Sequence, residues 1–169
     1  MASTLNQSLL LSEVKQALPD WKFGNLLGFG SYAVVYQAEF HEMRFAVKLI
    51  KEPKPSKDGK GLRSELDLHG LLCHSTPFIV PLFTPRFFST ARLGNWVAMP
   101  MELCEMTLEQ YCQSTPLTEE EVRPLVKMMV LALLVLKRAS VTHRDIKLSN
   151  WLVKLSSVDD DDEDDDGDG

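Results

Sequence analysis

The chain has 169 residues, of which 44% are hydrophobic, so it is long enough to bury the core of one domain. Its formal net charge is −6, but residues 159–168 contain nine acidic residues, and without them 18 basic residues remain against 15 acidic ones. That mildly basic remainder has no clustered basic patch interleaved with aromatic residues, which argues against nucleic acid as a partner.

Cysteine usage and apolar runs indicate the compartment. Cys73, Cys104 and Cys112 form neither a C-x-x-C pair nor an even framework, which is typical of reduced thiols inside the cell. Residues 1–20 lack the charged region, apolar stretch and cleavage site of a signal peptide. The most apolar run, residues 128–136, is too short to span a bilayer. We therefore expect an intracellular protein, cytoplasmic or nuclear, with no membrane partner.

Helical and strand periodicities follow one another in the first third of the chain. Apolar residues at helical spacing over residues 5–18 predict a short amphipathic helix that ends before Pro19. This helix either packs on the following sheet or binds a partner, and packing is the more frequent outcome. Residues 21–50 have strand periodicity and predict a three-stranded antiparallel meander, with a glycine turn between its first two strands and a short turn at residues 41–43.

The glycine turn and the third strand carry residue types that suit a phosphate-bearing ligand. Gly28 and Gly30 let the backbone approach a ligand closely, and their N–H groups can face phosphate oxygens. Lys48 ends an apolar strand, where burial of an unpaired ammonium group would be costly. A lone G-x-G is most often an ordinary hairpin, and an isolated strand lysine usually reaches the surface. Their occurrence in one meander favours an anion site.

Residues 51–61 are rich in Lys, Pro and Gly and predict an exposed connection. Residues 62–73 have helical periodicity. Residues 77–83 and 96–101 are interpreted as the last two strands of a five-stranded sheet, with the prolines at 81 and 100 favouring edges or irregular pairing.

Two helices are expected after the sheet. Residues 107–112 fit a short helix, and Thr118 with Glu121 forms a capping box that opens a long helix to about residue 139. The long helix is apolar around most of its circumference, so it needs further protein to cover it.

Residues 141–153 place a carboxylate, an ammonium group and an amide between apolar flanks. The segment His143-Arg144-Asp145-Ile146-Lys147-Leu148-Ser149-Asn150 matches the pattern H-R-D-x-K-x-x-N at every defined position. The chain thereby resembles the protein kinases, whose catalytic loop has this signature. The alternative is a charged surface loop between a helix and a strand, and it requires five polar matches to arise by chance.

This resemblance implies an α+β fold of the protein-kinase type. It implies a five-stranded antiparallel N-lobe with one main helix at residues 21–101, a hinge at 102–105, and at 106–158 the first helices and catalytic loop of an incomplete C-lobe. Residues 1–20 are expected to form an N-terminal extension. The acidic residues 159–169 are expected to form a disordered tail, because dense like charge repels itself.

The resemblance also implies roles for residues of the upper lobe. Lys48 would hold the α- and β-phosphates of ATP and pair with Glu65 of the following helix, with Asp67 as the alternative partner. Met101 would lie at the back of the adenine pocket, next to hinge backbone groups that meet the adenine edge. The implied ATP-binding residues are Leu27, Gly28, Gly30, Val35, Ala46, Lys48, Glu65, Met101, Glu102, Cys104 and Leu152.

In the implied mechanism, Asp145 accepts a hydrogen bond from the substrate hydroxyl and takes its proton. Lys147 would neutralise the γ-phosphate, and a lysine here accompanies serine/threonine substrates in this family. Asn150 would hold one Mg²⁺ ion. The implied function is that of a serine/threonine protein kinase with ATP and Mg²⁺ as cofactors, a protein with Ser or Thr as substrate, and Asp145, Lys147 and Lys48 as catalytic residues.

The sequence departs from the family after Val158, where an acidic run stands in place of Asp-Phe-Gly, an activation loop, A-P-E and a helical lower lobe. We therefore expect the 169-residue chain, truncated after the catalytic loop, to be weak or inactive in phosphotransfer. The alternative is a catalytically inactive kinase-like module that binds nucleotide or a partner protein, with the partner covering the exposed C-lobe helix. A small-molecule kinase of similar fold accounts less well for Lys147.

Overall fold

The computed structural model describes residues 4–30, 33–52 and 62–155, apart from the side chains of residues 4–6 and 63–65. Contacts divide the chain into two units. One comprises Met1–Leu103 and Thr118–Arg144, and the other comprises Cys104–Leu117 and Asp145–Gly169. Most of the predicted connection at 51–61 and the whole predicted tail at 159–169 lie outside the described residues.

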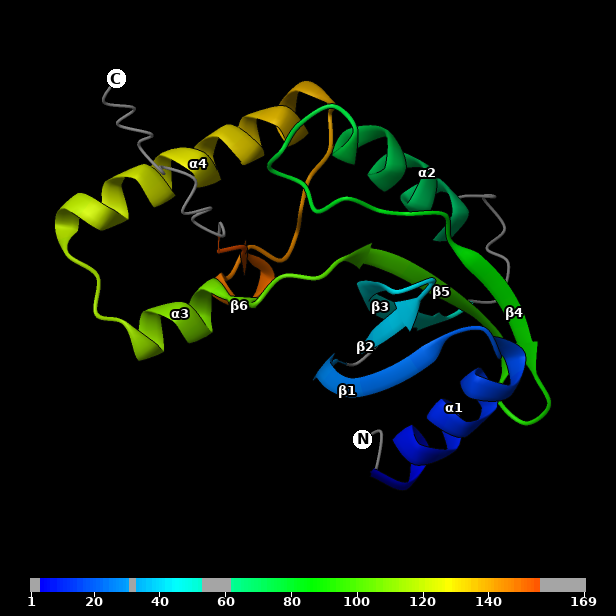
Figure 1. The fold of residues 1–169 in the computed structure, drawn as a ribbon. Coiled ribbons are helices and arrows are strands. Elements are labelled where there is room, and N and C mark those ends of the chain that lie inside the picture. Colours follow the sequence, from blue (N-terminus) through cyan, green and yellow to red (C-terminus); the bar gives the residue numbers. More distant parts are fainter. Residues whose placement is uncertain (1–3, 31–32, 53–61, 156–169) are drawn as a thin grey trace, which may run out of the picture. The chain divides into compact units, whose positions relative to one another are not determined.

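The first unit is built on a five-stranded antiparallel sheet, as expected for the N-lobe of an α+β fold (Figure 1). Its spatial order is β1-β2-β3-β5-β4. The strands are β1 (Lys22–Phe29), β2 (Ala33–Phe40), β3 (Met43–Lys51), β4 (Arg86–Thr90) and β5 (Gly94–Glu102). The predicted meander of the first three strands is confirmed by their antiparallel pairing.

The turn between β2 and β3 is one residue shorter than predicted. His41 and Glu42 form it, and Phe40 pairs directly with Met43, which is already part of β3. Both turn residues have positive φ, 49° and 65°. Two-residue hairpins favour this left-handed backbone because its twist matches that of the flanking strands, even where glycine is absent.

The helix predicted at residues 5–18 exists as α1 (Thr4–Ala17), and it packs on one face of the sheet. Leu10 and Val14 are buried there in one cluster with apolar residues of the strands. Next to them Trp21 stacks on Phe40 with ring centroids 4.7 Å apart. Burial of these aromatic rings, rather than helix propensity, therefore holds the N-terminal segment in place.

Three polar contacts fix α1 further. Glu13 is buried, with 7% of its surface exposed, and its carboxylate accepts a hydrogen bond from the Arg92 backbone N–H at 3.2 Å. The Arg92 side chain also lies 3.8 Å from the same carboxylate. The Tyr36 hydroxyl donates to the Gln7 carbonyl at 3.5 Å, and burial raises its pKa above the usual tyrosine value. These contacts supply the hydrogen bonding that buried polar groups need.

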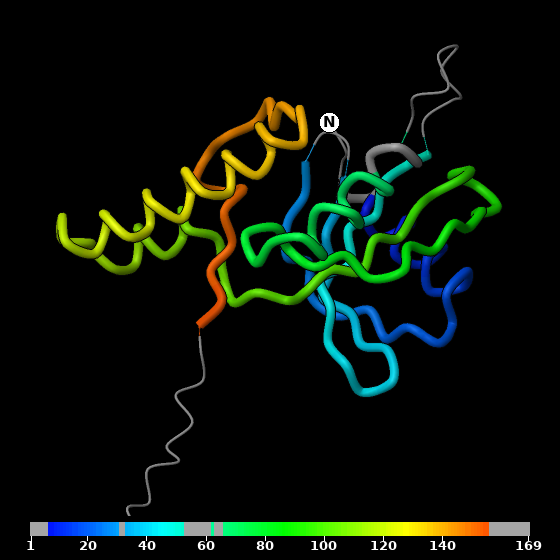
Figure 2. The backbone as a smooth tube through the Cα atoms, turned by 90° about the horizontal axis from the view of Figure 1, so that it is seen from above, coloured from blue at the N-terminus to red at the C-terminus, as the bar shows by residue number. Residues whose placement is uncertain are grey.

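The opposite face of the sheet is covered in part by α2 (Leu62–Cys73), which has the predicted bounds (Figure 2). Leu66 and Cys73 of α2 form a second buried cluster with Val97 and Met99 of β5. Side chains alternate across a strand, so residues of one parity on β3 and β5 contact α2 and those of the other parity contact α1. The sheet is therefore buried on both faces near its centre.

The prediction of a strand at residues 77–83 is wrong. That stretch is irregular, with one isolated bridge between Leu82 and Met101, and the fourth strand is β4 at Arg86–Thr90. Prolines at 77 and 81 remove two ladder donors, which disfavours regular pairing. Leu82 is buried against α2. Its apolar side chain serves this packing, and the strand-like pattern of the stretch does not reflect a strand. Pro100 pairs in regular register with Val47 of β3, contrary to the expected irregular pairing, and β4 pairs with β5 on the other side no further than Ala98.

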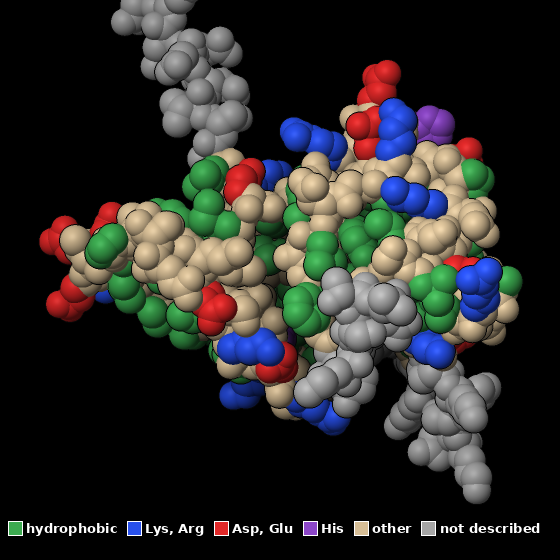
Figure 3. All heavy atoms as spheres, turned by 90° about the horizontal axis from the view of Figure 1, so that it is seen from below, with side chains coloured by type: hydrophobic (Ala, Val, Ile, Leu, Met, Phe, Trp, Pro, Cys, Tyr) green, Lys and Arg blue, Asp and Glu red, His purple; other side chains and the backbone are tan. Residues whose placement is uncertain are grey.

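The long helix α4 (Glu119–Arg138) begins at the predicted cap. Thr118 Oγ1 accepts from the Glu121 backbone N–H, and the Glu121 carboxylate accepts from the Thr118 N–H at 2.8 Å. Within the described chain Ala132 is its one buried residue. Figure 3 shows hydrophobic side chains in green at the surface, including some at the left of the view where α4 lies. The exposed apolar residues of α4 are Val122, Val126, Met128, Val130, Leu131 and Leu134.

Replacing Thr118 by alanine is expected to destabilise the first turn of α4 by about 1 kcal/mol, because the cap hydroxyl is lost. The Thr118 backbone and side-chain hydrogen bonds hold the pKa of Glu121 below its usual range. The capping contribution is thus present at neutral pH and is lost as the pH falls through the folded-state pKa. NMR titration should show the Glu121 pKa rising in Thr118→Ala. Thr118→Ser keeps a hydroxyl and should leave it low, and an unchanged pKa in Thr118→Ala would contradict the assignment.

The second unit is small and is held by backbone pairing between distant segments. A two-stranded sheet joins β6 (Met106–Thr107) to β7 (Leu152–Val153). It is followed by α3 (Leu108–Ser114), and a 3-10 turn η1 (Leu148–Asn150) precedes β7. None of the described helices of the chain combines the length and apolar character needed to cross a membrane.

Candidate active site

One face of the sheet collects most of the residues predicted to bind ATP in the first unit. The register aligns Val35 with Lys48, and Lys48 with Met99 of β5. The next row aligns Gln37, Ala46 and Met101. Residues directly opposite one another in antiparallel strands share a face. Val35, Ala46, Lys48 and Met101 therefore lie on one face, the face that α2 covers in part.

The glycine turn adjoins the first of these rows. Gly28 pairs with Val35, and the Gly30 N–H donates to the Ala33 carbonyl at 2.8 Å, which closes the turn. Among the described residues, a Cβ atom built on Gly28 or Gly30 would meet nothing within 4 Å. Internal packing therefore does not require glycine at these positions, and the open space leaves room for a ligand. Residues 31 and 32 of the turn lie outside the described residues.

Lys48 is half-buried on this face and, among the described residues, has no ion-pair partner. The predicted partner Glu65 belongs to α2 by its backbone, but its side chain lies outside the described residues. Asp67, the alternative partner, is exposed. The Lys48–Glu65 pair therefore stays a prediction.

The predicted hinge and the remaining ATP-contact residues are less well defined. The border between the two units falls between Leu103 and Cys104, inside the predicted hinge. The Glu102 N–H already donates to the Pro81 carbonyl at 3.1 Å, so this donor does not face an adenine edge. Leu27 lies in the irregular part of β1 and is exposed, and Leu152 pairs with Thr107 in the second unit.

Two of the predicted catalytic residues, Asp145 and Lys147, come together with the predicted metal ligand Asn150 within one loop of the second unit. Asn150 Nδ2 donates to Asp145 Oδ2 at 2.9 Å and to the Asp145 carbonyl at 2.7 Å. The Lys147 ammonium lies 3.0 Å from the same Oδ2. Arg144, immediately before, has a positive φ of 68°, a backbone conformation that costs energy for a non-glycine residue. The backbone of the loop is thus locally strained at Arg144, next to the place where three functional groups come together.

The Asp145 side chain is 61% exposed, which keeps its carboxylate accessible to solvent and to a substrate. Because Lys147 is also exposed, their ion pair contributes little to stability, about 0–1 kcal/mol. Its effect is on orientation, since two donors on Oδ2 restrict how the carboxylate can rotate. Because Asn150 Nδ2 donates to Asp145, the amide oxygen Oδ1 is the Asn150 side-chain atom that can accept a further contact.

A second segment supports this loop, and the sequence interpretation missed it. The Leu108 N–H donates to the Trp151 carbonyl at 2.7 Å, and the Leu155 N–H donates to Glu105 Oε2 at 3.0 Å. Thr107 caps α3 in a capping box with Gln110. The spacing T-x-x-Q could have revealed this cap. No local pattern reveals Glu105, because its partner is 50 residues away.

In the described residues no group of three or more His, Cys, Asp and Glu side chains could hold a metal ion. Asn150 as a ligand of Mg²⁺ stays a prediction.

Comparison with known proteins shows the family of the chain. Residues 21–159 match the protein kinase domain family, and these residues make up most of the chain. The chain belongs to the protein kinase family. This match spans the glycine turn, the strand lysine and the catalytic loop, and it confirms the family and the α+β fold expected from the sequence.

Among the curated relatives, the chain is 33% identical over 145 residues to "Serine/threonine-protein kinase PLK4" of Drosophila yakuba. It is also 33% identical over 141 residues to the protein of that name from Xenopus tropicalis. These matches cover 82% and 79% of this chain. They cover only 18% and 14% of the relatives, so the chain spans less than a fifth of their length.

Proposed function

We propose that this kinase-family chain contributes the nucleotide-binding sheet and the catalytic loop of a serine/threonine protein kinase, which transfers the γ-phosphate of ATP to a protein hydroxyl. The observation that carries the proposal is the loop in which Asp145, Lys147 and Asn150 lie within hydrogen-bonding distance. The match to protein kinases over residues 21–159 supports it.

Each group in the loop has a chemical role in this proposal. Asp145 orients the substrate hydroxyl and takes its proton as transfer proceeds. Asn150 keeps the Asp145 carboxylate in position through Oδ2. Lys147 stabilises negative charge at the transferred group, and a lysine two residues after the aspartate supports a Ser/Thr rather than a Tyr substrate.

The residues fit the two cofactors that the family uses. ATP supplies the phosphoryl group, and Mg²⁺ neutralises phosphate charge when both are bound. In this chain, the open glycine turn and Lys48 would bind the phosphates, Val35 and Ala46 would contact the base, and Asn150 Oδ1 would ligate Mg²⁺. The Asp-Phe-Gly aspartate, which would complete the metal site, does not occur in residues 151–169.

The 169-residue chain is therefore expected to bind Mg-ATP but to transfer phosphate weakly or not at all. The measurement is transfer of labelled γ-phosphate to a generic Ser/Thr substrate by purified protein, with Asp145→Asn as the control. Robust transfer that Asp145→Asn abolishes would contradict the expected inactivity and would support the kinase function directly. Absence of both transfer and Mg-ATP binding would remove the support for nucleotide chemistry in this chain.

A second candidate function is a catalytically inactive module that binds nucleotide or a partner protein. The observation that favours it is the apolar surface of α4, where six large apolar residues are exposed. Mg-ATP binding without any transfer under all conditions, together with a stable complex through α4, would favour this function over catalysis.

A further inference from the structure

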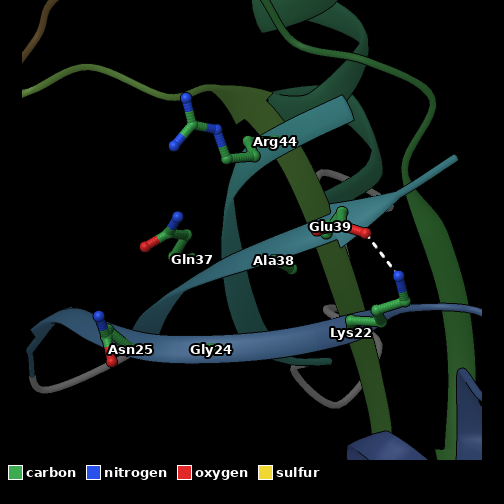
Figure 4. A pocket seen from close by; sticks show the side chains of 7 residues that line it. All are labelled: Lys22, Gly24, Asn25, Gln37, Ala38, Glu39 and Arg44. Atoms are coloured by element: carbon green, nitrogen blue, oxygen red, sulfur yellow. Dashed lines mark hydrogen bonds and ion pairs between the residues drawn. The ribbon is translucent and has the colours of Figure 1, made fainter. Parts of the chain in front are cut away.

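A shallow hollow lies on the sheet face that carries Ala46 and Lys48, at the end away from Lys48. The register places it in the row where Glu39 pairs with Arg44, next to the row of Gln37 and Ala46. It encloses about 270 Å³ and is shown in Figure 4. Its lining consists of Lys22, Gly24, Asn25, Gln37, Ala38, Glu39 and Arg44.

Three polar side chains from adjacent strands border the open side of the hollow. Asn25 of β1, Gln37 of β2 and Arg44 of β3 extend to the same side of the strands in Figure 4. Gly24, next to Asn25 on β1, has no side chain, so this part of the hollow stays open. Register shifts in β1 on both sides of Leu26 bend the strand at this position. Such irregularities often redirect side chains toward a binding surface.

The charges in the hollow are unevenly matched. Lys22 Nζ lies 2.6 Å from Glu39 Oε1, so the one carboxylate of the hollow already has a cationic partner (Figure 4). The Arg44 side chain forms no ion pair or hydrogen bond with any residue that the structure describes. Its guanidinium group is exposed. The hollow therefore presents one unmatched positive charge on β3, followed by the Gln37 amide on β2 and the Asn25 amide on β1.

This donor set matches a carboxylate better than a phosphate. A guanidinium group binds a carboxylate through two parallel N–H···O bonds, and the Asn25 and Gln37 amides can donate further hydrogen bonds. A phosphomonoester carries nearly two negative charges and is recognised by clusters of arginine residues. The hollow offers a single unmatched cation.

The size and position favour a peptide over a small molecule. Small-molecule pockets usually enclose about 300–1,000 Å³ and bury most of their ligand, whereas this hollow is smaller and open. The hollow lies over the first three strands, β1, β2 and β3, on an open face of the sheet. An extended peptide segment can cross this face and place a single side chain in the hollow.

We propose that the hollow binds an aspartate or glutamate side chain of an extended acidic segment from a partner protein. The segment crosses the open side of the hollow, and its carboxylate pairs with Arg44, where the neighbouring Gln37 amide can donate a further hydrogen bond. The hollow adjoins the proposed nucleotide face through the row of Gln37 and Ala46, but the proposal does not depend on phosphotransfer.

The test uses the whole chain and a short peptide of alternating Asp and Val, acetylated and amidated, with an Asn-for-Asp peptide as control. Calorimetric titration at low ionic strength should show binding of the Asp peptide and none of the Asn peptide. Arg44→Gln should weaken binding at least about tenfold, because a charge-assisted bidentate contact is lost. Arg44→Lys keeps the charge and should weaken binding less, since the planar fork is lost.

The matched control is Arg86→Gln, which removes the same charge from an exposed position of β4 and should change affinity less than about twofold. Equal weakening by the Arg44→Gln and Arg86→Gln substitutions would show non-specific charge attraction and overturn the proposal. Equal binding of the two peptides, or no binding of the Asp peptide, would also overturn it. Binding of the Asp peptide only after the acidic residues of 159–168 are replaced by neutral ones would show that the chain's own acidic run occupies the hollow. That result would overturn the proposal of a partner segment. Amide spectra of each variant verify that it is folded.

Discussion

Substitution of Lys48 by methionine is expected to weaken Mg-ATP binding roughly 10- to 100-fold. Lys48 lies in the row of Val35 on the proposed nucleotide face and has no ion-pair partner among the described residues. A charge-assisted contact to phosphate contributes about 1.5–3 kcal/mol, which corresponds to that loss of affinity. Methionine keeps the apolar stem, so the strand should stay folded.

The matched control for Lys48→Met is Lys51→Met, which changes an exposed lysine at the end of the same strand. Calorimetry should show near-wild-type affinity for Lys51→Met. Thermal unfolding without nucleotide should give the same midpoint for the wild type and both variants, within a few degrees. An unchanged affinity in Lys48→Met would refute the assigned phosphate contact, and an equal loss in Lys51→Met would reduce it to general electrostatic attraction.

Truncation of Leu49 to alanine is expected to destabilise the sheet unit by about 2–5 kcal/mol. Leu49 is 0% exposed and pairs with Val34 and Ala98 in the cluster beneath α1. Its truncation removes buried apolar area and leaves a cavity between strands that cannot fully close. A small domain has a total stability of about 5–15 kcal/mol, so the loss is a large part of it.

Urea denaturation of the wild type and Leu49→Ala measures this difference through the transition midpoint, with an unchanged slope. Leu71→Ala serves as the control, because Leu71 is 68% exposed and its truncation should change stability by less than about 0.5 kcal/mol. Equal stability losses for the two leucines would mean that the cluster beneath α1 is not the core of this unit.

The elements that the sequence predicted well are those with local signals. The capping box at Thr118 set the start of α4, and helical periodicity set both bounds of α2. The H-R-D-x-K-x-x-N segment predicted a loop that places Asp145, Lys147 and Asn150 together, because all three lie within six residues. The family followed from that loop and was then confirmed over residues 21–159.

The features that the sequence did not predict depend on contacts between distant residues. The apolar pattern of residues 77–83 predicted a strand, but the apolar Leu82 packs against α2 instead. Whether the N-terminal helix packs or binds a partner was open until Leu10 and Val14 were found buried on the sheet. The hydrogen bond between Glu105 and Leu155 and the Arg44 hollow also join residues far apart in sequence. No local pattern encodes such pairs.

The sequence by itself thus determined the family, the type of most elements and the chemical groups of the catalytic loop, since each depends on the spacing of residues that are close together in the chain. Tertiary structure decided which residues share the sheet face with Lys48, and that Asn150 and Lys147 hold the same oxygen of Asp145. It also decided that Arg44 stays unmatched while Glu39 is neutralised by Lys22. The physical reason is that strand register and side-chain pairing are selected by packing over the whole sheet, which no short window of sequence contains.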